Sequence, residues 1–183
     1  MKSFLITAAA SAVLLTSSCI SDNKKMHAST ADTGHLAAGS DKATAAATTT
    51  INGLDTLKTN NQIALTANDR MQFSDTLFKV NAAQLVTVKL TNIGKMPKES
   101  MGHTFTVLAK GADFTAYVTK ALHASSTDYQ PADMKSSVIA HTKLVGPGES
   151  DQITFKLPSK GVFDFLCTFP NHYGSMRGKI VAE

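Results

Sequence analysis

The sequence predicts an all-β fold, a β-sandwich with one short helical excursion. From Asn61 onward, short segments of alternating or continuous apolar character follow one another, and several are bounded by Asn, Gly, Pro or Asp. About seven short strands separated by turn residues are typical of two packed sheets. The expected strands are residues 63–65, 77–80, 85–90, 104–108, 152–157, 162–167 and 178–181.

One segment departs from the strand pattern and predicts the helix. Asp113 can cap a helix N-terminus, and apolar residues then recur at helical spacing. These residues are Phe114, Tyr117, Val118, Ala121 and Leu122.

The chain is predicted to contain one domain and two N-terminal appendages. With 183 residues it has the length of a single domain, and residues 20–60 contain too few large apolar side chains to pack a core. We therefore expect a signal peptide at 1–18, a flexible linker at 19–60 and a folded domain at 61–183. Residues 21–60 are rich in Ala, Thr and Ser, and we interpret His27 and His35 there as solvated linker residues.

The first residues have the features of an export signal. Lys2 supplies a positive charge, residues 4–15 are apolar, and small residues occupy 16–18. Cys19 follows directly and resembles the lipobox cysteine of bacterial lipoproteins. The match is imperfect, because Thr16 stands where Leu, Val or Ile is usual. We expect a lipidated Cys19 that tethers a periplasmic protein to a membrane, and the alternative is an ordinary secretory peptide cleaved nearby.

Charge and cysteine content exclude some functions. Residues 61–183 contain 13 Lys and Arg against 10 Asp and Glu, spread along the segment, so no basic patch favours nucleic acid. The two cysteines, Cys19 and Cys167, could form a disulfide in a secreted protein. Each has a better separate use, because Cys19 follows a signal sequence and Cys167 lies among candidate metal ligands.

The segment 167–176 predicts a copper site. It places Cys167, His172 and Met176 within ten residues, and a tight loop containing Pro170 and Gly174 can turn all three side chains toward one point. Thiolate and thioether favour Cu(I), while imidazole binds both Cu(I) and Cu(II). A structural zinc site would use Cys and His without Met.

The site needs a second imidazole, and His103 is the best candidate. It stands directly before the expected strand 104–108, and strand ends in a sandwich cluster at one pole. Taken singly, Cys167, His172 and Met176 could be an inert thiol, a surface histidine and a core methionine. Their joint spacing favours the metal site.

Four segments, in the same order, resemble the azurin family of bacterial blue-copper proteins. They are Asn-Asp-Arg-Met-Gln-Phe at 68–73, Met-Gly-His at 101–103, Val-Ile-Ala-His-Thr-Lys-Leu at 138–144 and Cys-Thr-Phe-Pro at 167–170, and the similarity runs from about Gln62 to the C-terminus. The resemblance implies a Greek-key, cupredoxin-like sandwich that transfers electrons through one copper ion cycling between Cu(I) and Cu(II). It implies His103, Cys167 and His172 as strong ligands, Met176 as a long axial ligand and the Gly102 carbonyl as a weak one.

The chain departs from the family pattern at several positions. Asn61 and Gln84 stand where many azurins have a disulfide, and Phe105 replaces a buried tryptophan. Asn171 replaces glycine before His172, and Thr104 replaces asparagine after His103. Changes around the ligands can alter a reduction potential without abolishing copper binding. The residues expected to surround the ligands are Thr104, Thr168, Phe169, Pro170 and Asn171, of which Pro170 has no N–H to donate to the sulfur.

The resemblance implies a one-electron shuttle between redox partners such as cytochromes or copper or haem reductases. His172 should present its imidazole edge at the surface, within an apolar docking patch made of Met71, Met96, Met101 and Phe169. A copper storage or delivery protein is the main alternative, and it predicts an open, exchangeable, Met-rich site. A copper enzyme would need an open coordination position or more ligands, and we interpret His123 and His141 as structural or surface residues.

Overall fold

The computed structural model describes residues 51–183. The expected signal peptide, Cys19, His27 and His35 lie outside these residues. A 3-10 turn, η1 (Leu54–Thr56), lies before the first strand, in the segment that we assigned to the linker. The domain boundary at Asn61 stays a prediction.

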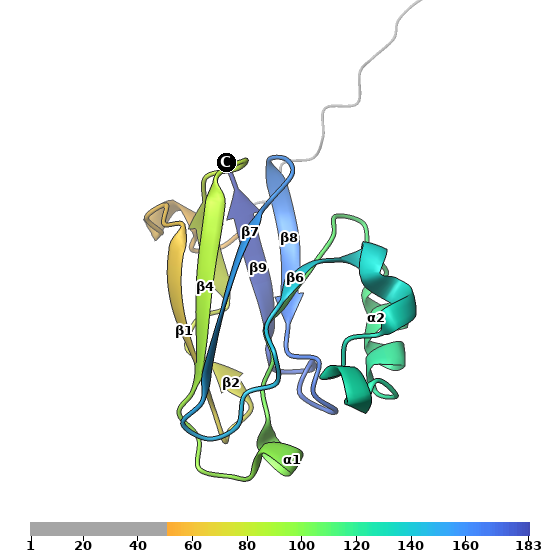
Figure 1. Cartoon of the computed structure of the whole chain (residues 1–183). Coiled ribbons are helices and arrows are strands. Elements are labelled where there is room, and N and C mark those ends of the chain that lie inside the picture. Colours follow the sequence, from red (N-terminus) through yellow and green to blue (C-terminus); the bar gives the residue numbers. More distant parts are fainter. Residues whose placement is uncertain (1–50) are drawn as a thin grey trace, which may run out of the picture. The chain divides into compact units, whose positions relative to one another are not determined.

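Two sheets form the sandwich (Figure 1). The four-stranded sheet has the order β2-β1-β4-β7, and the five-stranded sheet has the order β3-β9-β8-β5-β6. Strands β1 and β4 pair in parallel, as do β3 and β9, while the other pairs are antiparallel. The predicted Greek-key β-sandwich is confirmed. The strands are β1 (Gln62–Asn68), β2 (Gln72–Phe73), β3 (Leu77–Val80), β4 (Leu85–Asn92), β5 (Thr106–Leu108), β6 (Val138–His141), β7 (Ser150–Lys156), β8 (Gly161–Leu166) and β9 (Arg177–Ala182).

All seven expected strands overlap observed ones, and two observed strands were missed. Strand β2 has only two residues, too few for a pattern, and β6 is half-buried along most of its length without clear alternation. The expected strand 104–108 begins two residues late as β5. The N–H of Thr104 faces the Cys167 sulfur and that of Phe105 donates to the Thr142 hydroxyl, so side chains replace the strand partner there.

The predicted helix is present as α2 (Phe114–Ala121), and the Asp113 carboxylate accepts the N–H of Ala116 at 2.9 Å. The expected helical excursion is this helix, the longest one within residues 61–183. Three further short helical turns occur, α1 (Lys98–Met101), η2 (Ser125–Thr127) and η3 (Ala132–Ser137). They are too short for apolar periodicity, and prolines, Pro97 and Pro131, precede two of them. Within residues 51–183, no helix has the length and apolar character that crossing a membrane requires.

Aromatic side chains fill the space between the sheets near the metal-ligand segments. Phe105 is fully buried, and its ring centroid lies 4.9 Å from that of Phe165 and 6.3 Å from that of Phe73. A phenylalanine therefore occupies the core at the position where the azurin pattern has tryptophan.

The segment around His103 is fastened at one end of the sandwich by buried polar contacts. His103 and Val145 exchange two backbone hydrogen bonds, of 3.0 and 2.9 Å. The amide of Asn92, at the end of β4, donates to the Val145 carbonyl and accepts the N–H of Gly94. Helix α1, which leads into His103, lies at the end of the sandwich opposite the C-terminus (Figure 1).

We predict that Asn92→Ala lowers the free energy of unfolding by about 1–3 kcal/mol, because it removes a buried amide, leaves the Gly94 N–H without that acceptor and leaves the Val145 carbonyl with the His103 N–H alone. Urea unfolding followed by far-ultraviolet circular dichroism measures this, since the chain contains no tryptophan. Lys89→Ala, at an exposed position of the same strand, is the control and should change stability by less than about 0.5 kcal/mol. Equal stability of the two variants would contradict the fastening role of Asn92.

Candidate metal centre

Three side chains predicted as strong ligands lie together in the structure. His103, Cys167 and His172 are all buried, and their candidate ligand atoms lie within 4.8 Å of one another. The Cys167 Sγ lies 3.6 Å from His172 Nδ1. One thiol and two imidazoles on two distant segments therefore face a common point.

The His103 ring has the environment of a metal ligand. It is fully buried, and neither ring nitrogen makes a hydrogen bond of normal geometry within residues 51–183. The backbone of Asn68 raises the pKa of His103, but burial lowers this pKa by more. Buried polar atoms in native proteins nearly always have partners, so one of these nitrogens fits a bound cation.

The other ligand candidates lie on one tightly closed loop after β8. The N–H of Cys167 donates to the Met176 carbonyl at 2.9 Å, and the N–H of Met176 donates to the His172 carbonyl at 2.8 Å. Met176 is fully buried beside this loop. Backbone hydrogen bonds therefore hold Cys167, His172 and Met176 next to one another.

Burial sets the protonation of these groups. It lowers the pKa of His172 to about 4, with a smaller contribution from repulsion by His103, and it also lowers the pKa of His103. Burial raises the pKa of the Cys167 thiol, against weaker opposing hydrogen bonds from Thr104 and the backbone of Phe169. Both imidazoles are thus neutral, with free lone pairs, at neutral pH, and a metal that binds the sulfur must displace its proton.

Hydrogen-bond donors surround the sulfur. The N–H of Thr104 lies 3.4 Å from Cys167 Sγ and the Thr104 hydroxyl lies 3.8 Å from it. The Thr104 hydroxyl also accepts the N–H of Thr168 and bonds the Thr168 hydroxyl, both at 2.8 Å. Thr104 and Thr168, two of the residues expected around the ligands, therefore form the polar surroundings of the sulfur.

Gly102 stands where a weak carbonyl ligand was expected, directly before His103. It is buried, and a Cβ built on it would lie 2.6 Å from the Lys98 carbonyl oxygen and 2.8 Å from Leu144 Cδ1. Close packing, rather than an unusual backbone angle, therefore requires glycine here.

The expected docking patch is only partly exposed. Met96 is 42% exposed and Met71 and Met101 are half-buried, whereas Phe169 is 6% exposed and belongs to the core. The Phe169 ring packs against those of His172 and Tyr129, with centroids 4.7 and 5.1 Å away. His172 is 2% exposed, so its expected surface edge is at most narrow.

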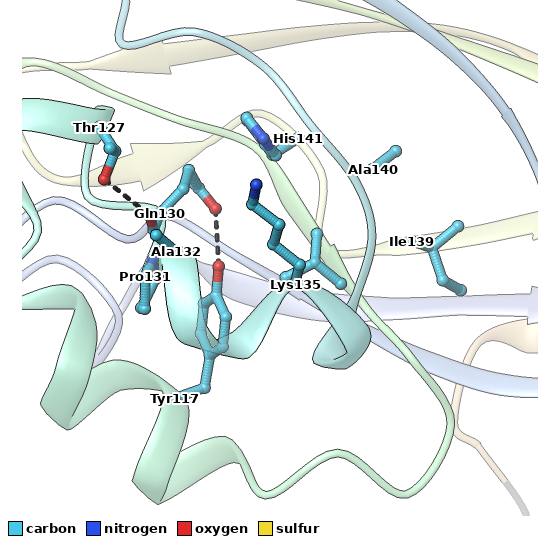
Figure 2. Close-up of a pocket in the computed structure, with 10 residues that line it drawn as sticks. Tyr117, Thr127, Gln130, Pro131, Ala132, Lys135, Ile139, Ala140 and His141 are labelled. Carbon is cyan, nitrogen blue, oxygen red and sulfur yellow. Dashed lines mark hydrogen bonds between the residues drawn. The ribbon is translucent and has the colours of Figure 1, made fainter.

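Two neighbours of the site had no signal in the sequence. The Tyr117 hydroxyl donates to Gln130 Oε1 at 2.7 Å, and the two side chains face each other in Figure 2. Gln130 Nε2 in turn donates to the hydroxyls of Thr106 and Thr168, both at 2.9 Å. We interpreted Tyr117 only as an apolar helix residue, and a single glutamine before Pro131 belongs to no recognisable motif.

The remaining histidines of the described domain lie outside the cluster. His123 and His141 are exposed, and His141 Nδ1 contacts the Thr142 carbonyl at 3.0 Å. Their interpretation as surface residues agrees with these positions.

Asn171, which precedes His172, adopts a left-handed backbone conformation with a φ of 66°. Asparagine tolerates this region better than other non-glycine residues do. We predict that Asn171→Gly keeps or slightly raises the stability of the copper-free protein, whereas Asn171→Val lowers it by about 1–2 kcal/mol. Thermal unfolding of both variants measures the difference, and indistinguishable midpoints would show that the loop does not impose this angle.

Comparisons with known proteins agree with the geometry. Residues 59–183 match the family model described as copper binding proteins, plastocyanin/azurin family. The chain is 38% identical over 125 residues to azurin from Pseudomonas denitrificans, covering 66% of this chain and 97% of that protein. It is 40% identical over 118 residues to the outer membrane protein H.8 of Neisseria gonorrhoeae, covering 62% of this chain and 63% of that protein.

A solved structure extends the match to three dimensions. Reduced auracyanin from the photosynthetic bacterium Roseiflexus castenholzii superposes with a TM-score of 0.62 at 30% identity, covering 69% of this chain and 99% of that one. One copper ion is the cofactor that suits both the family and the soft donor set of the site. The chain belongs to the plastocyanin/azurin family of copper-binding proteins.

Proposed function

We propose that this protein is a type 1 (blue) copper electron carrier. Its strong ligands are His103, Cys167 and His172, with Met176 as a weak axial ligand and the Gly102 carbonyl as a second weak one. The observation that carries the proposal is the buried cluster of one thiol and two imidazoles, in which the His103 ring nitrogens have no hydrogen-bond partner within residues 51–183. Copper, when bound, supplies the one-electron couple between Cu(I) and Cu(II).

The chain's own residues supply a stiff ligand frame. His103 is fixed through its backbone pair with Val145, and Cys167 is fixed through the closed ligand loop. A frame that moves little when the ion changes charge suits fast electron transfer, since little reorganisation is required. The buried position of all three ligands also leaves little room for a substrate, which favours a carrier over a copper enzyme.

Partners are proposed to be redox proteins such as cytochromes or copper or haem reductases. Weak complexes between electron-transfer proteins use small interfaces. We propose that exposed apolar side chains in the loop before α1 form such an interface. Ile93 is 59% exposed and Met96 is 42% exposed there. With Met71 and Met101 half-buried, we keep Met71, Met96 and Met101 as the docking patch and give Phe169 a packing role.

We predict that the copper-loaded protein has an intense blue thiolate-to-copper absorption band and that Cys167→Ser abolishes it. Absorption and electron paramagnetic resonance spectra of the two proteins measure this. The matched control is Ser175→Ala in the same loop, which removes a hydroxyl that donates to the Met71 and His172 carbonyls but no candidate ligand atom, and it should keep the band. A colourless wild-type protein would overturn the proposal.

Copper storage or delivery remains the alternative, and the same samples distinguish it. A carrier should retain copper against a chelator and exchange electrons with a cytochrome without losing metal. A protein that releases its copper to the chelator within the time of mixing would favour delivery.

We further propose that Cys19 is lipidated and tethers the domain to a membrane on the periplasmic side. The supporting observations are the signal-like residues 1–18 and the resemblance of their end to a lipobox. The match to an outer membrane protein is consistent with such a location. A lipoprotein cysteine carries several acyl chains, and several acyl chains hold a protein on a membrane more firmly than one acyl chain does.

When the full chain is expressed in a Gram-negative bacterium, we predict that it incorporates labelled palmitate and sediments with membranes. Cys19→Ser should lose the label and leave the membrane fraction, whereas Ser21→Ala should behave as the wild type. Membrane association of the Cys19→Ser protein would contradict the lipid anchor.

A further inference from the structure

A chain of buried polar side chains leads from α2 to the Cys167 sulfur. It runs from the Tyr117 hydroxyl to Gln130, then to the hydroxyls of Thr168 and Thr104. Tyr117, Thr104 and Thr168 are at most 1% exposed and Gln130 is 8% exposed. A fully connected network in the core is strong enough to hold a fixed pattern of donors.

The orientation of the Gln130 amide is set by its surroundings. Three oxygens lie near Nε2: the hydroxyls of Thr106 and Thr168 at 2.9 Å and the carbonyl of Asp128 at 3.4 Å. A carbonyl can only accept, so the nitrogen belongs at that end. The oxygen at the other end accepts the proton of Tyr117, whose pKa burial raises so that the phenol stays protonated.

Hydrogen-bond counting then gives the direction of the two threonine hydroxyls. The Thr168 oxygen already accepts from Gln130, and the Thr104 oxygen already accepts the N–H of Thr168. If Thr168 donates to Thr104, the Thr104 proton is free to point at Cys167 Sγ, 3.8 Å away. If Thr104 donated instead, the Thr168 proton would have no acceptor within residues 51–183.

We propose that Gln130, held by Tyr117, is a positioning residue that directs the Thr104 hydroxyl proton onto the Cys167 sulfur and thereby raises the reduction potential of the copper site. The inference rests on the proposed electron-transfer function. The reduced site carries one more negative charge, part of it on the sulfur, so a hydroxyl donor there stabilises the reduced state more than the oxidised one.

The test is the reduction potential of five copper-loaded variants. Thr104→Val removes the donor and should lower the potential, while Thr104→Ser keeps a hydroxyl and should restore it. Gln130→Leu leaves the Thr168 oxygen without its donor, so the Thr104 proton is drawn from the sulfur toward that oxygen and the potential should shift in the same direction. At a fixed solution potential, we expect the ratio of reduced to oxidised protein to fall by about threefold or more in Thr104→Val. A hydrogen bond to a charged group is stronger than a hydrogen bond between neutral groups, so its loss should be measurable.

Thr106→Val is the matched control. The Thr106 hydroxyl accepts the other N–H of Gln130 and is equally buried, but it does not lie on the path to the sulfur. Its loss should lower stability and leave the potential unchanged. A change of potential in this variant as large as that in Gln130→Leu would overturn the proposed direction of the path.

The double variant Thr104→Val/Gln130→Leu separates positioning from general disturbance of the fold. If Gln130 acts through the Thr104 hydroxyl, its replacement should add no further change once that hydroxyl is gone. An equal effect of Gln130→Leu in both backgrounds, or an unchanged potential in Thr104→Val, overturns the inference while leaving a blue protein. If Gln130→Leu does not fold, Tyr117→Phe replaces it, with the same expected direction and the same overturning results.

A copper-independent measurement completes the test. In the copper-free protein, the Tyr117 hydroxyl proton should give a slowly exchanging NMR signal with a nuclear Overhauser contact to the Gln130 amide. Tyr117→Phe should remove that signal. Absence of the signal from the wild type would overturn the positioning network, whereas a network that persists in a protein without a blue band would count against the proposed function alone.

Discussion

The closure of two segments at one pole of the sandwich is the constraint on which the rest of the metal centre depends. His103 and Val145 exchange a pair of backbone hydrogen bonds, and a single backbone hydrogen bond joins Cys167 to Met176. Neither contact involves a ligand atom, so the side-chain nitrogens and sulfur stay available. The backbone and the core beneath it therefore resist distortion of the site. A change in the charge of a bound metal ion need not move the ligand side chains far.

At this pole of the sandwich, polar side chains are buried close to an aromatic cluster. Unsatisfied polar atoms in such a place destabilise a fold by about 1–3 kcal/mol each. Most of them have partners here, including the Thr142 hydroxyl, which accepts the N–H of Phe105. The ring nitrogens of His103 are the exception within residues 51–183, and one of them is free to bind the copper that the family implies.

The sequence allowed the sheets and the ligands to be predicted, because both leave local signals. Period-two segments marked seven strands, and the spacing of Cys167, His172 and Met176 marked a loop with copper-like donors. His103 could be chosen because strand ends gather at one pole. The two-residue β2, the one-turn α1 and the contact between Tyr117 and Gln130 leave no such signal, since they depend on which segments meet after folding. The burial of Phe169 was missed for the same reason, because its packing against Tyr129 joins residues far apart in the chain.

The threonine at position 104 explains why a second layer of polar residues is needed. An asparagine, which the azurin pattern has there, carries amide protons in a fixed plane, whereas a threonine hydroxyl can turn its single proton toward any neighbour. With both the Cys167 sulfur and the Thr168 hydroxyl within reach, the Thr104 proton has two possible acceptors. In the proposed network the Gln130 amide, anchored at its other end by Tyr117, donates to the Thr168 oxygen and so favours the sulfur as the acceptor of the Thr104 proton. On that proposal, a short side chain beside Cys167 makes a buried glutamine on a distant segment part of the surroundings of the sulfur.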